Sequence, residues 1–289
     1  MNAVAAARVV AGQALQESLR RRVFVVVLGL TVAFGALYAW GVHELFQDVD
    51  AIQGTQFLDG RTLAGATILG LAMFGTLFLG VVLAVFFTLN AVRGDAERGL
   101  LQPLVVRPLG RPAYLLGRWM AAAGVSAAYV VAVFLGAVLI TGVVGGYWPD
   151  SVVLPALELG LAAATLAAVA ILGSVLLGTV ANGITVLMVF GAGLLAGLLG
   201  QIGAALDSRA LVQVADVAAW VLPFEGLYQD ALFRLVSDTA AQGGITGQLV
   251  QLGPLGGSNA ASTAFFPFAI VYVVAVGAVA SWAFARRDL

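Results

Sequence analysis

The only long charged interruption in the first two thirds of the chain runs from Arg93 to Arg118. Five arginines lie in it, together with Asp95 and Glu97, and long uncharged runs flank it on both sides. The acids can open a short helix, because negative side chains stabilise the positive N-terminal end of a helix. The leucines that follow fall on one helical face. An amphipathic helix with charged rims predicts a contact with another protein, where rim charges fix the register.

Other side chains exclude most catalytic and cofactor chemistry. Cysteine is absent, which excludes disulfides, thiol nucleophiles and thiolate metal sites. All 14 basic residues are arginine, and a phosphate-binding P-loop requires lysine, so we expect no ATP site in this chain. A single histidine, His43, argues against a b-type haem carrier, which needs paired axial ligands. We therefore expect a protein that is not an enzyme and that holds no cofactor or metal itself.

The composition indicates a protein that crosses a membrane several times. Hydrophobic residues make up 61% of the chain and charged residues 10%, whereas soluble domains are roughly a quarter charged. The mean hydropathy is +1.02. The positions of the few charges therefore divide the chain into apolar spans and polar connections.

We predict a single all-α membrane domain with six transmembrane helices. Each apolar run is long enough for the roughly 30 Å hydrocarbon core of a bilayer. The spans are expected at 23–42, 62–92, 119–145, 153–180, 184–204 and 264–285. The tight turn between the fourth and fifth spans is expected at Ala181-Asn182-Gly183, with Asn182 serving the turn.

The connections on the basic side predict its orientation. Residues 1–22 are expected to form an amphipathic helix at the membrane surface, and 93–118 form the charged loop described above. In this topology 11 basic residues lie on that side and 3 on the other. Loops rich in arginine stay cytoplasmic, so both termini are expected in the cytoplasm.

The segment 207–263 is the least membrane-like part of the chain and is expected outside as a helical cap followed by a loop. Two amphipathic helices are predicted in it, broken at Pro223. One interpretation is that the cap packs its apolar face on the ends of the spans. The other is an outer gate with Pro223 as its hinge. The gate residues would be Trp220, Pro223, Phe224, Glu225 and Tyr228.

Two further features lie within the spans. Gly193 and Gly197 have the spacing that allows helices to approach closely, so close helix–helix contact is the preferred interpretation, and a contact with a second copy of the chain is one form of it. Glu158 is expected near the outer interface as a solvated carboxylate on the rim, with a lining role in an exit vestibule as the alternative. No carboxylate is expected near the middle of a span.

The charged stretch resembles the coupling loop of ABC-2-type permeases, the membrane subunits of a class of ATP-driven exporters. The matching positions are Glu97, Gly99, Leu101, Leu104, Pro108, Arg111 and Gly117-Arg118. Leu100 stands where the family usually has threonine, and Pro103 where leucine is common. The closing residues 284–289 also resemble the C-terminus of that family.

This resemblance implies a permease subunit of an exporter, coupled to separate ATPase subunits. It assigns the contact with the ATPase to Asp95, Glu97, Arg98, Gly99, Leu101, Leu104, Pro108 and Arg111. Two ATPase copies would carry ATP and Mg²⁺. A second permease copy, identical or related, and membrane lipid would complete the assembly in a prokaryotic cytoplasmic (inner) membrane, with no nucleic acid involved. The resemblance does not select a substrate.

Two other functions fit parts of the sequence. An ion-coupled secondary transporter is disfavoured, because the sequence indicates no membrane-buried carboxylate and no inverted repeat with broken helices. A structural membrane subunit of a respiratory or maturation complex would explain the spans but not the docking-like loop.

Overall fold

The computed structural model describes residues 8–13, 22–51, 60–88, 111–149, 151–241 and 264–286. All the regular secondary structure within these residues is helical. A short helix covers 8–13. The longer helices are α2 (Arg22–Ala51), α3 (Gly60–Thr88), α6 (Arg111–Gly145), α7 (Val153–Leu176), α8 (Thr179–Ala205), α9 (Arg209–Val221), α10 (Pro223–Ala241) and α12 (Phe265–Ala285).

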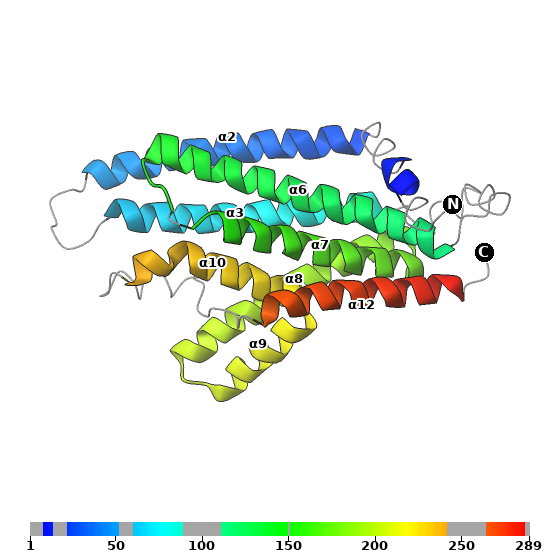
Figure 1. Cartoon of the computed structure of the whole chain (residues 1–289). Helices are drawn as coiled ribbons and strands as arrows, with labels where there is room; N and C mark the ends of the chain where they lie inside the picture. The colour runs from blue at the N-terminus through cyan, green and yellow to red at the C-terminus, as the bar shows by residue number, and fades with distance from the viewer. Residues whose placement is uncertain are drawn as a thin grey trace.

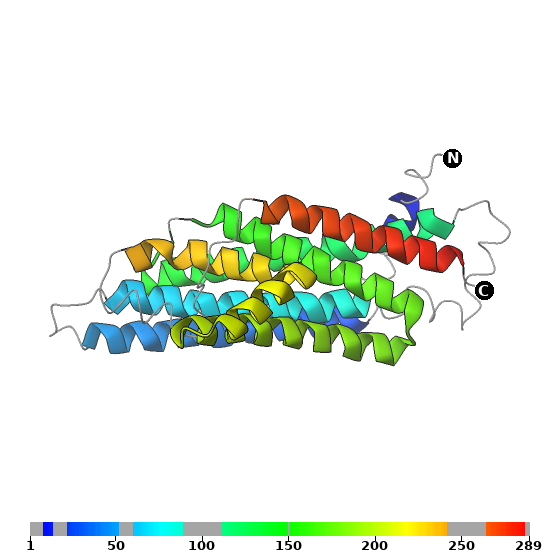
Figure 2. The ribbon, with the colours of Figure 1, turned by 90° about the horizontal axis from the view of Figure 1, so that it is seen from below.

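Six of these helices, namely α2, α3, α6, α7, α8 and α12, are long and apolar enough to cross a membrane. The chain is therefore a multi-pass membrane protein with the number of spans expected from the sequence. The helices lie side by side along roughly one axis, except that α8 is inclined away from the others towards its end beside α9, and the start of α2 and the end of α12 are at the same end of the bundle (Figure 1). The view turned by 90° shows the same alignment, with α9 crossing obliquely beside α8 (Figure 2).

Helices α3 and α7 form the centre of the bundle. In each of them 67% of the most apolar stretch is buried, compared with 17% in α2 and 22% in both α8 and α12. Helix α7 is rich in alanine, and its fully buried residues include Ala162, Ala163 and Ala170. Small side chains let α3, α6, α10 and α12 all pack closely against it.

Two helices extend further than the hydropathy predicts. Helix α2 continues beyond residue 42 to Ala51. Around the predicted end of the span, Trp40 donates a 3.0 Å hydrogen bond to Glu44, and a 2.8 Å hydrogen bond joins His43 to Gln47. Both pairs are four residues apart, a spacing that stabilises an exposed helical turn. Helix α6 begins at Arg111 rather than near residue 119. A proline at 112 is compatible with this start, because the first turn of a helix needs no N–H donor there.

The turn between α7 and α8 does not lie at Ala181-Asn182-Gly183, and that prediction is wrong. The chain leaves the helix at Leu177, which is extended at φ −112° and ψ 161° and donates to Gly173 O at 2.7 Å. Asn182 lies in the first turn of α8, is fully buried, and donates through Nδ2 to Ala170 O at 3.0 Å. Its side-chain amide therefore links α8 to α7. An asparagine suits this role, because its amide can donate a hydrogen bond to a backbone carbonyl of another helix.

The helical residues 8–13 pack at the end of the bundle where α6 begins. Val10 is buried in a small apolar cluster with Tyr114, Leu115, Ile171 and Phe284. These residues come from the start of α6 and the ends of α7 and α12. The rest of the predicted surface helix, 1–7 and 14–21, lies outside the described residues.

Candidate functional site

Most of the residues assigned to ATPase coupling lie outside the described part of the chain. Asp95, Glu97, Arg98, Gly99, Leu101, Leu104 and Pro108 belong to the range 89–110, which the structure does not describe. Arg111 is the first residue of α6. The coupling assignment therefore stays a prediction, and the described candidate site is the pair of helices between the fifth and sixth spans.

Helices α9 and α10 form a sharply bent pair. The chain bends by 109° from one helix to the other at Leu222. Pro223 opens α10, and the N–H of Leu222 closes α9 by donating to Ala218 O at 2.7 Å. The predicted break at Pro223 is confirmed, because proline suits the first position of a new helix but cannot continue the old one.

Helix α10 does not lie over the end of the bundle, so the predicted cap is wrong for this helix. It runs alongside α7 and also contacts α3, α8, α9 and α12 (Figure 1). Six of its side chains are almost completely buried: Phe224, Leu227, Tyr228, Ala231, Leu232 and Leu235. The apolar face predicted from the sequence is real, but the central helices cover it instead of the outer ends of the spans.

One face of α8 accommodates this bent pair. A methyl group at Gly193 would overlap the ring of Phe224, and one at Gly197 would overlap the carboxyl group of Glu225. Further along the same face, a Cβ at Gly200 would lie 2.8 Å from Cβ of Ala215 on α9. Gly193 and Gly197 thus allow the close helix–helix contact that their spacing predicts, here with α10 of the same chain, and a contact of these glycines with a second copy stays a prediction.

Aromatic rings hold the bend at Leu222 and Pro223, which we call the elbow, against the start of α12. The indole of Trp220, at the end of α9, lies edge-on to Phe268 at 4.6 Å and to Phe265 at 5.6 Å between ring centroids. Edge-to-face geometry at these separations stabilises a pair beyond its buried area. Trp220 is nevertheless 49% exposed, and no residue of α9 is buried. The elbow is therefore packed against α12 on one side, and the side formed by α9 is exposed.

A second set of rings joins α10 to the central helix α3. Phe190 of α8 lies 6.5 Å from Phe74 and 6.1 Å from Phe78 of α3, and 5.9 Å from Phe224 of α10. Each contact brings rings within the range in which aromatic side chains attract one another. Phe190 therefore bridges Phe224 to α3, in addition to the direct contacts between α10 and α3.

A buried charge cluster joins α10 to α7. Arg234 donates through Nε to Oε1 of Glu158 at 3.1 Å, and through Nη2 to Oδ2 of Asp230 at 3.0 Å. The side chain of Glu158 is only 2% exposed, whereas that of Arg234 is 35% exposed. Glu158 is thus a buried partner in an ion pair, and the expectation of a solvated rim carboxylate is wrong. Its second oxygen, Oε2, is buried without a hydrogen-bond partner among the described residues.

Glu225, one of the predicted gate residues, is buried as well. It is 4% exposed and accepts a 2.9 Å hydrogen bond from Nε2 of Gln229, one turn further along α10. No cation in the described part of the chain pairs with it. The hydroxyl of Tyr228, 1% exposed and also a predicted gate residue, has no hydrogen-bond partner within that part either. Polar groups in this state are costly in an apolar bundle, which makes this region a candidate functional site.

The sequence contains only part of the signal for the charge cluster. Asp230 and Arg234 are four residues apart on one helix, a spacing that indicates an ion pair. The contribution of Glu158 could not be read in this way, because it comes from a helix 76 residues away in the chain.

No protein-family model matches the chain, and the curated proteins contain no significant match. The function therefore rests on the sequence and on the geometry of the bent pair.

Proposed function

We propose that this chain is the permease subunit of an ABC exporter, which works with a second permease copy and two ATPase subunits. The resemblance of 93–118 to a coupling loop motivates the proposal. The arrangement of the bundle supports it, since the end of α3, the start of α6 and the end of α12 lie at the same end (Figure 1). Arg8, Arg118 and Arg286 lie on or next to helices at this end, which agrees with a cytoplasmic location for both termini.

The observation that carries the proposal is the aromatic connection between α3 and α10. Helix α3 leads directly into the range 89–110, where an ATPase would bind. A shift of α3 on ATP binding would act on Phe190 through Phe74 and Phe78, and Phe190 would act on Phe224. A rigid central helix with packed aromatic neighbours is a physical route by which one end of a bundle can influence another segment.

The same helix supports a route between two copies. Although α3 is two-thirds buried, it exposes Leu71, Phe74, Phe78 and Phe86 at helical spacing. These residues form one face of α3, which we call the aromatic stripe. In the proposal, the aromatic stripe faces the second permease copy, and the substrate passes between the two copies.

In this proposal the bent pair is the gate. The elbow at Leu222 and Pro223 provides the hinge, because the helical hydrogen bonds are interrupted there. The cluster of Glu158, Asp230 and Arg234 holds α10 against α7 in the resting arrangement. Opening would then require this cluster to rearrange.

Purification of the tagged chain from its native membrane tests the proposal. An ATP-hydrolysing subunit should copurify, and Glu97→Arg should weaken its association while membrane insertion is retained. Asp216→Arg is the matched control, because it makes the same charge change on the exposed surface of α9, away from the loop. An unchanged yield of ATPase with Glu97→Arg removes Glu97 from the contact. Absence of any copurifying ATPase contradicts the proposal itself.

Ion-coupled transport is a second candidate, and Glu158 is the observation that favours it. A buried carboxylate on a membrane span, with one oxygen unpartnered among the described residues, is typical of ion and proton pathways. The arginine beside it argues for a structural ion pair instead. Uptake of an ion or proton by vesicles that contain only this chain, abolished by Glu158→Gln, would decide for the second candidate.

A further inference from the structure

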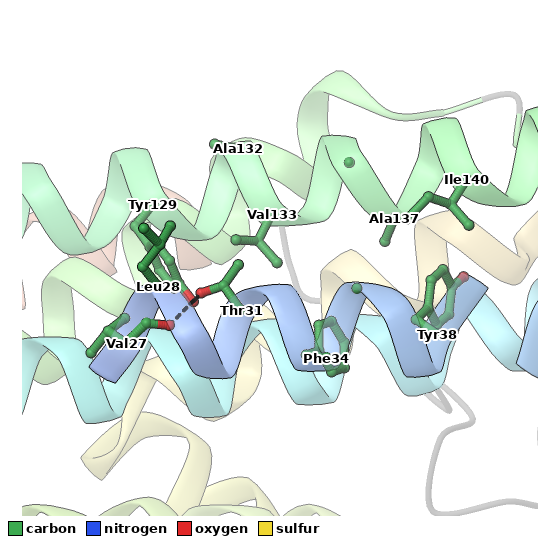
Figure 3. A pocket seen from close by; sticks show the side chains of 12 residues that line it. Val27, Leu28, Thr31, Phe34, Tyr38, Tyr129, Ala132, Val133, Ala137 and Ile140 are labelled. Atoms are coloured by element: carbon green, nitrogen blue, oxygen red, sulfur yellow. Dashed lines mark hydrogen bonds between the residues drawn. The ribbon is translucent and has the colours of Figure 1, made fainter. Parts of the chain in front are cut away.

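A groove between α2 and α6 is a feature that the proposed function does not use. It has a volume of about 390 Å³ and is lined by side chains of these two spans alone (Figure 3). From α2 the lining includes Leu28, Phe34 and Gly35, and from α6 it includes Ala132 and Gly136. Gly35 and Gly136 create the hollow, because a Cβ built at either position would meet no atom within 4 Å.

Two hydrogen bonds cross between the helices, one near each end of the groove. The hydroxyl of Tyr129 lies 2.5 Å from Oγ1 of Thr31, which itself donates to Val27 O at 2.7 Å (Figure 3). At the other end Tyr38 bonds to Oγ1 of Thr141 at 2.6 Å. Between the two bonds the helices run for roughly 11 Å along α2 and roughly 18 Å along α6, at 1.5 Å per residue. The hydroxyl groups are thereby paired, and the groove offers apolar surface only.

The groove opens on the outer surface of the bundle. Leu28 in its lining is 54% exposed, and the neighbouring residues Val32 and Leu139 are 64% and 56% exposed. Both helices are long and apolar enough to span a membrane, so this surface is at the depth of the hydrocarbon core. None of the lining residues is charged.

We propose that this groove binds the acyl chain of a membrane lipid. Its length along two aligned spans, its lack of unpaired polar groups and its opening towards hydrocarbon all fit a flexible methylene chain. In lipid, binding of this kind is driven by close packing rather than by escape from water. The bound chain fills the hollow beside α2, the least buried of the six spans. This inference does not depend on an ATPase partner.

Photo-crosslinking in vesicles tests the inference. The purified chain is reconstituted with a phospholipid that carries a diazirine within one acyl chain, and labelled peptides are mapped by mass spectrometry. We expect labelling to concentrate on the groove residues of α2 and α6. Gly136→Leu and, independently, Gly35→Leu should reduce it several-fold, because a leucine side chain at either position occupies the hollow.

Matched glycines on the same helices provide the controls. At Gly29 on α2 and Gly124 on α6 an added Cβ would also meet no atom within 4 Å, but neither glycine lines the groove. Gly29→Leu and Gly124→Leu should therefore leave the labelling of the groove unchanged. Equal labelling of all lipid-facing helices, or labelling that survives both groove-filling variants, would overturn the inference. Crosslinks from the groove to a second copy of the chain would overturn it too, in favour of a helix as the occupant.

Discussion

Arg234 of α10 lies 3.1 Å from Glu158 of α7, and this ion pair joins the bent pair of helices to the centre of the bundle. The pair spans 76 residues of sequence and is buried on the carboxylate side. Asp230 shares the guanidinium from one turn away on α10. An arginine with two carboxylates gives α10 a defined depth and rotation against α7, which apolar packing alone does not specify.

Glu158→Gln should lower the thermal stability of the detergent-solubilised protein. Oε1 loses its charge-assisted hydrogen bond from Arg234, which we expect to cost about 1–2 kcal/mol. The loss is limited because Arg234 keeps Asp230 and is partly exposed. A shift in melting temperature measures the effect. Asp216→Asn, on the exposed side of α9, is the control and should leave the melting temperature unchanged. Equal melting temperatures for Glu158→Gln and wild type would show that the pair adds no stability.

Gly193→Leu should displace α10, because the new side chain would occupy the space of the Phe224 ring. Overpacking of this kind costs roughly 1–3 kcal/mol or more, so melting temperature should fall and proteolysis within α9 and α10 should increase. Gly191→Leu is the control on the same helix, since no atom lies within 4 Å of a Cβ there. If Gly193 serves dimer packing instead, the variant will change the oligomeric state in size-exclusion chromatography and leave proteolysis of α10 unaltered.

Single cysteines should report the orientation cleanly, because the chain contains no cysteine. Asp48, near the end of α2, and Arg286, after α12, are exposed at opposite ends of the bundle (Figure 1). A membrane-impermeant maleimide should label Asp48→Cys in intact cells and Arg286→Cys only after the membrane is opened. The cysteine-free wild type gives the background. Labelling of Arg286→Cys alone in intact cells would reverse the proposed orientation.

A disulfide between α8 and α9 should test the gate. In Gly200→Cys/Ala215→Cys the two Cβ atoms start 2.8 Å apart, and a disulfide needs a separation of roughly 3.5–4.5 Å, so a small outward shift suffices. If the bent pair must move away from α8, the oxidised complex should lose ATP hydrolysis by the copurified ATPase and regain it on reduction. The two single-cysteine variants control for the substitutions. Full activity with the disulfide demonstrably formed would leave α9 a purely structural role.

The pattern of apolar runs and prolines was enough to predict the six spans and the break before α10. Span number follows from hydropathy because a bilayer of fixed thickness sets the length of every apolar run. The break at Pro223 follows because a proline lacks the N–H that a continuing helix requires. Both are local properties of the chain, so neighbouring residues were enough to predict them. The apolar face of α10 was predicted for the same reason.

The partners of that apolar face, in contrast, could not be predicted from neighbouring residues and became visible in the folded chain. An amphipathic pattern says that one side of a helix is covered, but the ends of the spans and the centre of the bundle would satisfy it equally. The partners that determine the choice are distant in sequence: the ring of Phe224 packs on Gly193, and Arg234 forms an ion pair with Glu158. Asn182 was assigned to a turn for the same reason, since its true partner, the carbonyl of Ala170, lies on another helix. Such contacts depend on how the spans associate, and hydropathy carries no information on that association, because lipid and neighbouring helices are equally apolar.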